Sequence, residues 1–162
     1  MVDRLYIRFG EASAFDVVGI ERGGAILAGR IVQLFNKRYG ESPKIGRLDI
    51  TLYRDDLYTG LEKISMGDTQ VPFAIDDRII VLIDDVLFTG RTVRAALQEL
   101  ADLGRPACVY LCVLVDRGHR ELPIQADDVA LRIETEKSDR VELALSESGS
   151  DSDGVILHTN HQ

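Results

Sequence analysis

The stretch VLIDDVLFTGRT, residues 81–92, decides the fold class of this chain. It begins with aliphatic residues of the buried type and then changes to two adjacent aspartates, Asp84 and Asp85. A strand that only filled a core would not end on paired carboxylates. Because open α/β sheets bind their ligands beyond the carboxyl ends of the strands, this change predicts a binding loop after a buried strand.

The rest of the stretch has the chemistry of an anion site. A loop is expected over residues 86–91, followed by a helix that Thr92 could cap. Successive backbone N–H groups and a helix start form a concavity that binds anions, and Gly90 permits close approach. The two carboxylates would accept hydrogen bonds from a sugar diol. Taken singly, the aspartates would also suit a solvated turn and Thr92 a plain cap, but the whole pattern favours a ribose 5-phosphate site.

The flanking sequence predicts a parallel α/β sheet. Apolar runs that suit strands are found at residues 15–20, 45–53, 78–84 and 107–115. Apolar residues at helical spacing are Leu27, Ile31, Leu34 and Phe35 in one intervening segment and Val93, Leu97 and Leu100 in the next. Alternation of strands and helices in this manner is typical of an α/β fold.

The chain has 162 residues, so we expect a single domain over residues 1–162. Within it we expect a short N-terminal arm over residues 1–14 and a long polar loop over residues 54–77. Near the C-terminus, two apolar runs flank the acidic stretch SESGSDSD, residues 146–153. This arrangement predicts a β-hairpin over residues 140–158.

Composition excludes several classes of protein. The net charge of −8 argues against unspecific affinity for nucleic acid or anionic membranes. No apolar run approaches the roughly 20 residues of a membrane span, and no signal peptide is visible, so a cytoplasmic protein is expected. Cys108 and Cys112 are expected to be reduced core thiols on one face of a strand. Three histidines without Cys/His spacing argue against a zinc site.

Residues 81–92 closely resemble the phosphoribosyl pyrophosphate signature of the type I phosphoribosyltransferases. VLFTGRTVRAAL (86–97) and LVDRGHRELPI (114–124) are similar to the PyrR family, whose members regulate the pyrimidine operon and are uracil phosphoribosyltransferases; DITLYRDDL (49–57) extends the match. The resemblance covers about residues 15–145. It implies an α/β fold with a central, mostly parallel sheet flanked by helices, a small hood and a C-terminal β-hairpin.

The resemblance implies roles for individual residues around phosphoribosyl pyrophosphate. Asp84 and Asp85 would bind the ribose hydroxyls. The 5-phosphate would lie among Leu87, Phe88, Thr89, Gly90, Arg91 and Thr92. GIERGG, residues 19–24, takes the place of the pyrophosphate loop, with Arg22 on the diphosphate and Gly23 and Gly24 supplying unusual backbone conformations. Residues 54–77 would be a mobile lid in which Arg54 helps neutralise the diphosphate, so the implied catalytic set is Arg22, Arg54, Asp84 and Asp85.

The resemblance also implies a base site and a cofactor. The residues that match the uracil-facing region are Val115, Asp116, Arg117 and Gly118, and their backbone groups would read the base edge. His119 and Arg120 belong either to this site or to the surface. Magnesium is implied as a cofactor that the substrate carries, with no direct protein ligand apart from Asp116 as a candidate.

The family's second activity is binding of pyrimidine operon messenger RNA, controlled by uridine nucleotides. Lys137 matches a basic position of the RNA surface and Arg140 lies near it; Arg132, Arg4 and Arg8 are further candidate cations. These residues alternate with acidic ones, as on an ordinary solvated edge. The family's longer N-terminal arm predicts either an incomplete N-terminus here or a lost RNA role.

Two alternatives stay open. The chain could be an RNA-binding regulator that keeps the nucleotide site only as a sensor, or a type I transferase for a purine base. LVDRGHRELPI favours the pyrimidine reading over the second of these. The resemblance also implies a homodimer or a dimer of dimers.

Overall fold

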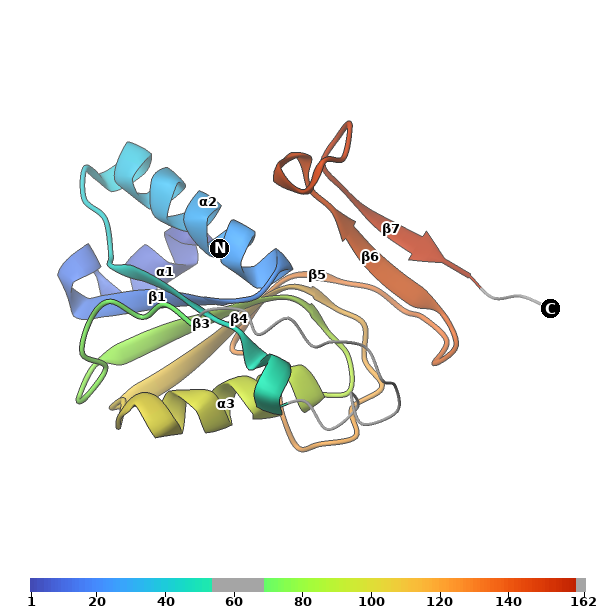
Figure 1. Ribbon diagram of the computed structural model, residues 1–162. Coiled ribbons are helices and arrows are strands. Elements are labelled where there is room, and N and C mark those ends of the chain that lie inside the picture. The colour runs from blue at the N-terminus through green and yellow to red at the C-terminus, as the bar shows by residue number, and fades with distance from the viewer. Residues whose placement is uncertain (54–68, 160–162) are drawn as a thin grey trace.

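Five parallel strands form a central sheet; the apolar runs of the sequence predict four of them but not the fifth, Asp128–Arg132. They are β1 Phe15–Ile20, β2 Ile45–Leu48, β3 Ile79–Leu87, β4 Cys108–Asp116 and β5 Asp128–Arg132. Their order across the sheet is β2–β1–β3–β4–β5. This computed structural model describes residues 1–53 and 69–159 (Figure 1). The α/β fold class is therefore confirmed.

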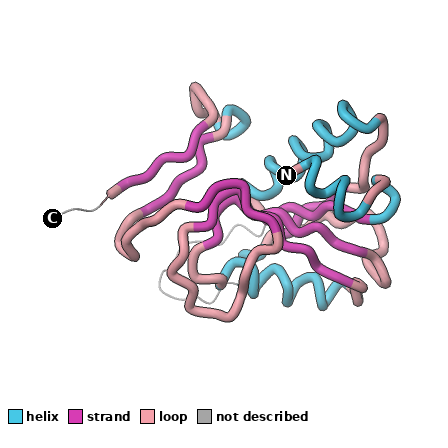
Figure 2. The backbone as a smooth tube through the Cα atoms, turned by 180° about the vertical axis from the view of Figure 1, so that it is seen from behind, coloured by secondary structure: helices cyan, strands magenta, loops and turns pink. Residues whose placement is uncertain are grey.

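Within the described part of the chain, three helices cover the two faces of the sheet. They are α1 Val2–Phe9, α2 Gly23–Tyr39 and α3 Arg91–Leu103, and short 3₁₀ turns occur at Ala12–Ala14, Ile50–Tyr53 and Ser146–Ser148. Figure 2 shows α1 and α2 on one face and α3 on the other. Side chains of β1 alternate between two cores: Phe15 and Val17 pack with the first pair of helices, and Val18 and Ile20 pack with α3.

The expected helical stripes are only partly correct. Ile31 and Phe35 of α2 are buried, but Leu34 is 54% exposed. In α3 the residue Leu97 is 39% exposed, whereas Ala96 is fully buried. Each stripe is narrower than the sequence spacing indicates, because a residue at its edge meets solvent instead of the sheet.

Three boundaries also differ from expectation. The strand expected over residues 45–53 ends at Leu48 and continues as a 3₁₀ turn, and β3 runs on to Leu87 instead of stopping at residue 84. The N-cap of α3 is Gly90, with φ of 93°, so Thr92 lies inside the helix and is not its cap. A left-handed conformation at this position is one that glycine adopts without steric cost.

Both cysteines lie in β4 and are free. Cys112 is buried as expected, and burial raises the pKa of its thiol. Cys108 is exposed, because it lies at the first position of the strand, so its assignment to the core is wrong.

The C-terminal hairpin is formed by β6 Arg140–Ala144 and β7 Gly154–His158, which pair antiparallel. Arg30 of α2 holds the loop between these strands. It donates from Nε to Glu147 over 2.8 Å and from Nη1 to Asp153 over 2.6 Å. The hydrogen bonds from Arg30 lower the pKa of Glu147 to about 2.

The residues expected to form an N-terminal arm fold as helix α1 against α2. Leu5 is fully buried between them, and the rings of Tyr6 and Tyr39 stack with centroids 3.9 Å apart. Among the helices within residues 1–53 and 69–159, none is long and apolar enough to span a bilayer.

Candidate functional site

The paired aspartates lie beside the turn that follows β1. Asp84 and Asp85 are near the carboxyl end of β3, and β3 is the neighbour of β1 in the sheet. A Cβ atom added to Gly23 would be 2.2 Å from Asp85 Oδ2, and one added to Gly24 would be 2.3 Å from the carbonyl oxygen of Ile83. The fold therefore brings together the two loops that the resemblance assigns to ribose and diphosphate.

Gly23 and Gly24 play a different structural part from the expected one. Both belong to the first turn of α2 and have no positive φ, so they do not supply an unusual backbone conformation. The unusual feature is the cis peptide bond between Glu21 and Arg22. The two glycines supply space instead, because the strand that carries the aspartates runs too close for a side chain.

This close approach gives a first prediction. Gly24→Ala should destabilise the protein by about 1–3 kcal/mol and weaken inhibition by added diphosphate, because its methyl group would collide with the backbone of β3. Gly29→Ala in the same helix is the matched control, since a Cβ there meets nothing within 4 Å. The control should be neutral or stabilising by about 0.5–1 kcal/mol. Thermal unfolding and diphosphate inhibition measure both effects, and equal behaviour of the two variants would contradict the steric explanation.

A pocket of about 250 Å³ lies at the loop between β3 and α3. Its lining residues are Asp84, Val86, Leu87, Phe88, Thr89, Gly90, Arg91 and Thr92. The pocket thus collects Asp84 and all six residues that the resemblance places around the 5-phosphate. It also lies at the start of α3, where the helix dipole favours an anion.

The peptide groups of this loop have a common orientation. The carbonyl oxygen of Leu87 accepts a hydrogen bond from the backbone N–H of Arg117 over 3.1 Å, and that of Thr89 accepts from Glu121 over 3.0 Å. Between them, the carbonyl of Phe88 accepts from the Arg120 side chain over 2.7 Å. Since N–H and C=O point in opposite directions across a trans peptide, the N–H groups that follow these carbonyls point away from residues 117–121. That is the side on which an anion can be bound.

The carboxylate of Asp116, at the end of β4, is held by hydrogen bonds and ion pairs. Asp116 is level with Leu87 in the sheet register and only 8% exposed. Its Oδ1 accepts from Arg120 Nη2 over 2.5 Å and from the Gly118 N–H over 3.0 Å. Burial alone would raise the pKa of Asp116, but these hydrogen bonds and the charges of Arg120 and Arg132 lower it below its usual value. The carboxylate is therefore ionised at neutral pH.

The side chain of Arg117 serves the structure of the site. It is buried and donates to the carbonyl oxygens of Asp139 and Glu136, each over 2.7 Å. Its guanidinium carbon also lies 4.0 Å from the centroid of the Phe88 ring. Only the backbone of Arg117 is left for a base, as expected for this region. Of its expected neighbours, Val115 is fully buried and Gly118 is exposed with φ of 76°.

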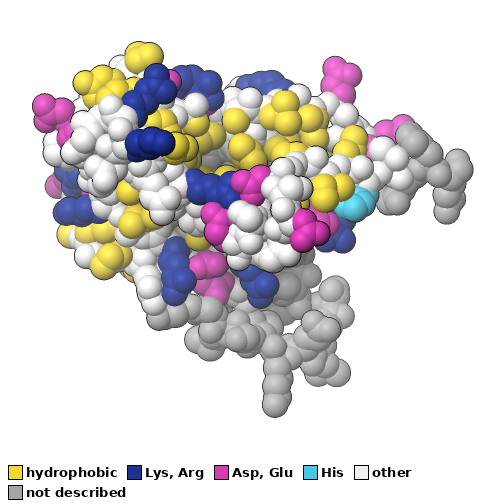
Figure 3. Space-filling view, turned by 90° about the horizontal axis from the view of Figure 1, so that it is seen from above, with side chains coloured by type: hydrophobic (Ala, Val, Ile, Leu, Met, Phe, Trp, Pro, Cys, Tyr) yellow, Lys and Arg dark blue, Asp and Glu magenta, His cyan; other side chains and the backbone are white. Residues whose placement is uncertain are grey.

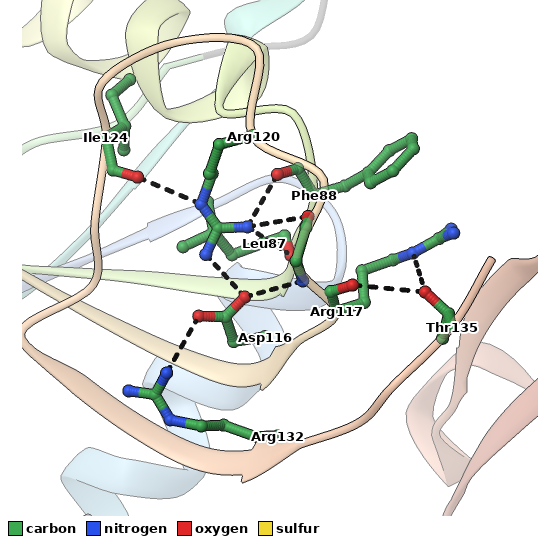
Figure 4. Close-up of polar contacts among 9 residues, drawn as sticks. Leu87, Phe88, Asp116, Arg117, Arg120, Ile124, Arg132 and Thr135 are labelled. Atoms are coloured by element: carbon green, nitrogen blue, oxygen red, sulfur yellow. Dashed lines mark hydrogen bonds and ion pairs between the residues drawn. The ribbon is translucent and has the colours of Figure 1, made fainter. Parts of the chain in front are cut away.

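Sequence reasoning left Arg120 between site and surface, and its side chain lies between the loops that follow β3 and β4 (Figure 4). Its guanidinium group contacts both the loop after β3 and the loop after β4. The available signal was its position four residues after Asp116, within reach of that carboxylate. His119 is exposed, and its Nε2 lies 2.7 Å from the carbonyl oxygen of Thr135.

A larger hollow lies on the other side of the Arg22 turn. It measures about 980 Å³, and its lining includes Glu21, Arg22, Arg47, Gln70 and Glu147. Arg22 is exposed, so its charge can reach an anion there. Spacing along the sequence gave no sign that Arg47 and Gln70 lie near Arg22. Arg54 and residues 54–68 of the expected lid lie outside the described residues.

Four of the five cations expected to face RNA are in ion pairs, and the fifth, Arg8, lies over an aromatic ring. Lys137 pairs with Glu121 over 2.9 Å, and Arg140 pairs with Glu142 over 3.6 Å. Arg132 and Arg4 pair with Asp116 and Asp128, and Arg8 lies over the ring of Tyr110. Figure 3 shows basic and acidic side chains intermixed on the face that contains the hairpin. This arrangement agrees with the alternation of basic and acidic residues that the sequence shows around Lys137 and Arg140.

Comparison with known proteins gives consistent results. A family model described as Phosphoribosyl transferase domain matches residues 10–145. The Bifunctional protein PyrR of Pelotomaculum thermopropionicum is 48% identical over 143 residues, which cover 88% of this chain and 79% of that protein. The protein of the same name from Listeria monocytogenes is 46% identical over 147 residues, covering 89% of this chain and 80% of that protein.

Solved structures with the same architecture include hypoxanthine phosphoribosyltransferases. That of Trypanosoma cruzi has a TM-score of 0.64 and 16% identity, over 83% of this chain and 70% of that one. A hypoxanthine-guanine enzyme of Bacillus anthracis has a TM-score of 0.61 and 16% identity, over 83% of this chain and 74% of that one. At this level of identity the likeness shows the fold alone.

Proposed function

The chain belongs to the PyrR family of the type I phosphoribosyltransferases, and on this basis we propose how its residues divide the family's two activities. It is a uracil phosphoribosyltransferase and a regulator of pyrimidine operon attenuation. The observation that carries the proposed residue roles is the meeting of Asp84 and Asp85 with the Arg22 turn on one side and the 250 Å³ pocket on the other.

In the proposed reaction, N1 of uracil attacks C1 of phosphoribosyl pyrophosphate as the bond from C1 to the diphosphate oxygen breaks, and the proton of N1 passes to solvent. The products are uridine 5-monophosphate and diphosphate. Backbone N–H groups of residues 88–92 hold the 5-phosphate, and Asp84 and Asp85 hold the ribose hydroxyls. Arg22 faces the departing diphosphate, with Arg54 proposed to assist. Catalysis is then positioning and charge neutralisation, without a covalent enzyme intermediate.

The base site is proposed at the loop after β4. The polar edge of the base is read by backbone groups of residues 115–118. The side chains of Arg117 and Asp116 fix the conformation of these groups through their own hydrogen bonds. A base edge whose donors and acceptors do not match would leave buried polar groups unpaired. This cost gives the site its selectivity.

Magnesium fits this site as an ion carried by the substrate. Ribose and diphosphate oxygens would supply most of its ligands, and Asp116 is the candidate protein ligand, since carboxylate oxygens are the protein ligands that magnesium prefers. When bound, the ion neutralises charge on the diphosphate. The chain's own part is to orient the ribose through Asp84 and Asp85 and to present Arg22 to the leaving group.

Base choice tests the enzymatic part. Diphosphate release from phosphoribosyl pyrophosphate and magnesium should be seen with uracil and not with hypoxanthine, guanine or adenine. A site built to hydrogen-bond one polar edge rejects a mismatched edge by about 10⁴-fold. Efficient transfer to a purine would overturn the uracil assignment and favour the purine alternative. No turnover with any base, but tight uridine monophosphate binding, would favour the sensor alternative.

Lys137 is the proposed RNA contact, and its ion pair with Glu121 must be broken for RNA to bind its ammonium group. Glu121 bonds both Lys137 and Arg91 of α3, and these hydrogen bonds lower the pKa of Glu121. An RNA phosphate must therefore compete with Glu121 for the ammonium group. Lys137→Ala should weaken binding to a pyrimidine leader hairpin and reduce the salt slope by about one phosphate contact.

The RNA measurement is a filter-binding titration over several salt concentrations, with and without uridine monophosphate. The nucleotide should tighten binding, because coupled sites affect each other reciprocally. Lys37→Ala, which removes an exposed lysine from α2, is the control and should bind as the wild type does. If the wild-type chain ignores the leader at low salt, the RNA role of Lys137 and Arg140 is excluded.

We also propose that the protein acts in the cytoplasm as a homodimer or a dimer of dimers. Val155, Ile156 and Leu157 of β7 are between 37% and 43% exposed and provide apolar surface for association.

A further inference from the structure

Arg120 has no part in the assignments above, yet its guanidinium group joins two loops of the site. From Nη1 it donates to the carbonyl oxygen of Phe88 over 2.7 Å and to that of Gly118 over 3.0 Å. Its Nε donates to the carbonyl oxygen of Ile124 over 3.0 Å, and its Nη2 donates to Asp116. Figure 4 shows these bonds radiating from one planar group. A side chain with this many internal partners is not a surface cation.

The hydrogen bond from Arg120 to Phe88 matters because, with it, three consecutive carbonyl groups of the loop are held. The carbonyls on either side, those of Leu87 and Thr89, are held by backbone N–H groups of residues 117–122. Only the carbonyl of Phe88 depends on a side chain for its short bond. The peptide that follows Phe88 therefore keeps its N–H toward the phosphate pocket only while Arg120 holds its carbonyl on the other side.

The bond to Asp116 gives Arg120 its second function. Asp116 Oδ1 also accepts a hydrogen bond from the Gly118 N–H, so the carboxylate connects Arg120 to the backbone of residues 115–118, here called the base loop. The same guanidinium plane thus fixes the backbone at Phe88 and at Gly118. Arginine suits this task, because its donors have a fixed fork geometry that lysine lacks.

We propose that Arg120 is a positioning residue that sets the orientation of the 5-phosphate loop and its spacing from the base loop. It touches neither substrate; it acts through the carbonyl of Phe88 and through Asp116. This role deepens the proposed function, since it concerns the same two substrate subsites.

The test compares Arg120→Met, Arg120→Lys and Arg120→Ala with Arg38→Met, an exposed arginine of α2 that pairs with Asp3. Steady-state kinetics should show KM for phosphoribosyl pyrophosphate raised about 10- to 100-fold in Arg120→Met, because a charge-assisted hydrogen bond that orients the loop is lost. KM should rise more than kcat falls, since the 5-phosphate is bound in the ground state and the transition state alike. Arg120→Lys should remain impaired, and guanidinium ion should restore part of the activity of Arg120→Ala. The Arg38→Met variant should match the wild type.

Two results would overturn the proposal. One is an unchanged KM for phosphoribosyl pyrophosphate in Arg120→Met. The other is a lowered melting temperature with equal loss of activity in all three variants and no rescue by guanidinium, which would show a purely structural role. If the wild type does not transfer uracil at all, the proposed function fails but this inference is still tested. Calorimetric binding of ribose 5-phosphate must then be weaker in Arg120→Met than in the wild type, and equal affinity rejects the positioning role.

Discussion

Replacing Asp84 and Asp85 with asparagine should reduce affinity for phosphoribosyl pyrophosphate more than any other change in the site. Each single variant should remove the charge-assisted hydrogen bond proposed to a ribose hydroxyl, which is worth about 1.5–3 kcal/mol, or about 10- to 150-fold in affinity. The fold should be kept, because asparagine retains the acceptor oxygen that Asp84 offers to the Asp85 N–H over 3.0 Å. Titration calorimetry with magnesium present measures the effect.

The control for this prediction is Asp151→Asn, which removes one charge from the exposed hairpin loop. It should leave the affinity unchanged. Because Asp84 and Asp85 are neighbours, their effects should not be additive. The affinity lost in the double variant should differ from the sum of the losses in the two single variants. Wild-type affinity in both single variants would remove the ribose assignment.

The largest expected effect on stability is at the opposite end of the sheet. Asp16 of β1 is 1% exposed, and its Oδ2 accepts from Arg78 Nε over 2.8 Å. Its Oδ1 is buried without a hydrogen-bond partner among residues 1–53 and 69–159. Arg78→Met would therefore leave a buried charge uncompensated. This should cost about 3 kcal/mol, the lower end of the usual range, because Arg78 itself is 33% exposed.

A double variant distinguishes this explanation from a general loss of packing. Asp16→Leu combined with Arg78→Met removes both charges and should be more stable than Arg78→Met alone. In thermal unfolding, the melting temperature of Arg78→Met should be lower than that of the wild type by roughly 6–12 °C for a chain of this size. A double variant less stable than the single one would contradict the electrostatic explanation.

The parts of the fold that the sequence predicts are those with local signals. Continuous apolar runs mark buried parallel strands whatever their partners, and the change to Asp84 and Asp85 lies near the carboxyl end of one of them, although that strand continues to Leu87. The left-handed conformation of Gly90 at the start of α3 is not predicted, since the sequence favours Thr92 as the cap. Periodicity predicts which face of a helix is apolar but not where that face ends, so Leu34 and Leu97 are exposed.

The features of the fold and the site that the sequence does not predict depend on contacts between segments far apart in the chain. Gly23, the residue after Arg22, lies against Asp85 because β1 and β3 are neighbours in the sheet, an order that spacing along the chain does not reveal. Arg30 and Glu147 are 117 residues apart, and no periodicity connects them. The role of Arg120 follows from where the carbonyls of another loop point, which only three-dimensional coordinates show. Charge composition likewise could not show that Lys137 and Arg140, the proposed RNA contacts, are in ion pairs.

The central claim is that one site binds ribose, 5-phosphate and uracil at the carboxyl ends of β3 and β4, and a crystal structure with uridine 5-monophosphate tests it most directly. The predicted result places the phosphate on N–H groups of residues 88–92, the ribose hydroxyls on Asp84 and Asp85, and the uracil edge on residues 115–118. A nucleotide bound instead in the 980 Å³ hollow beside Arg47, with the Asp84 loop empty, would contradict it.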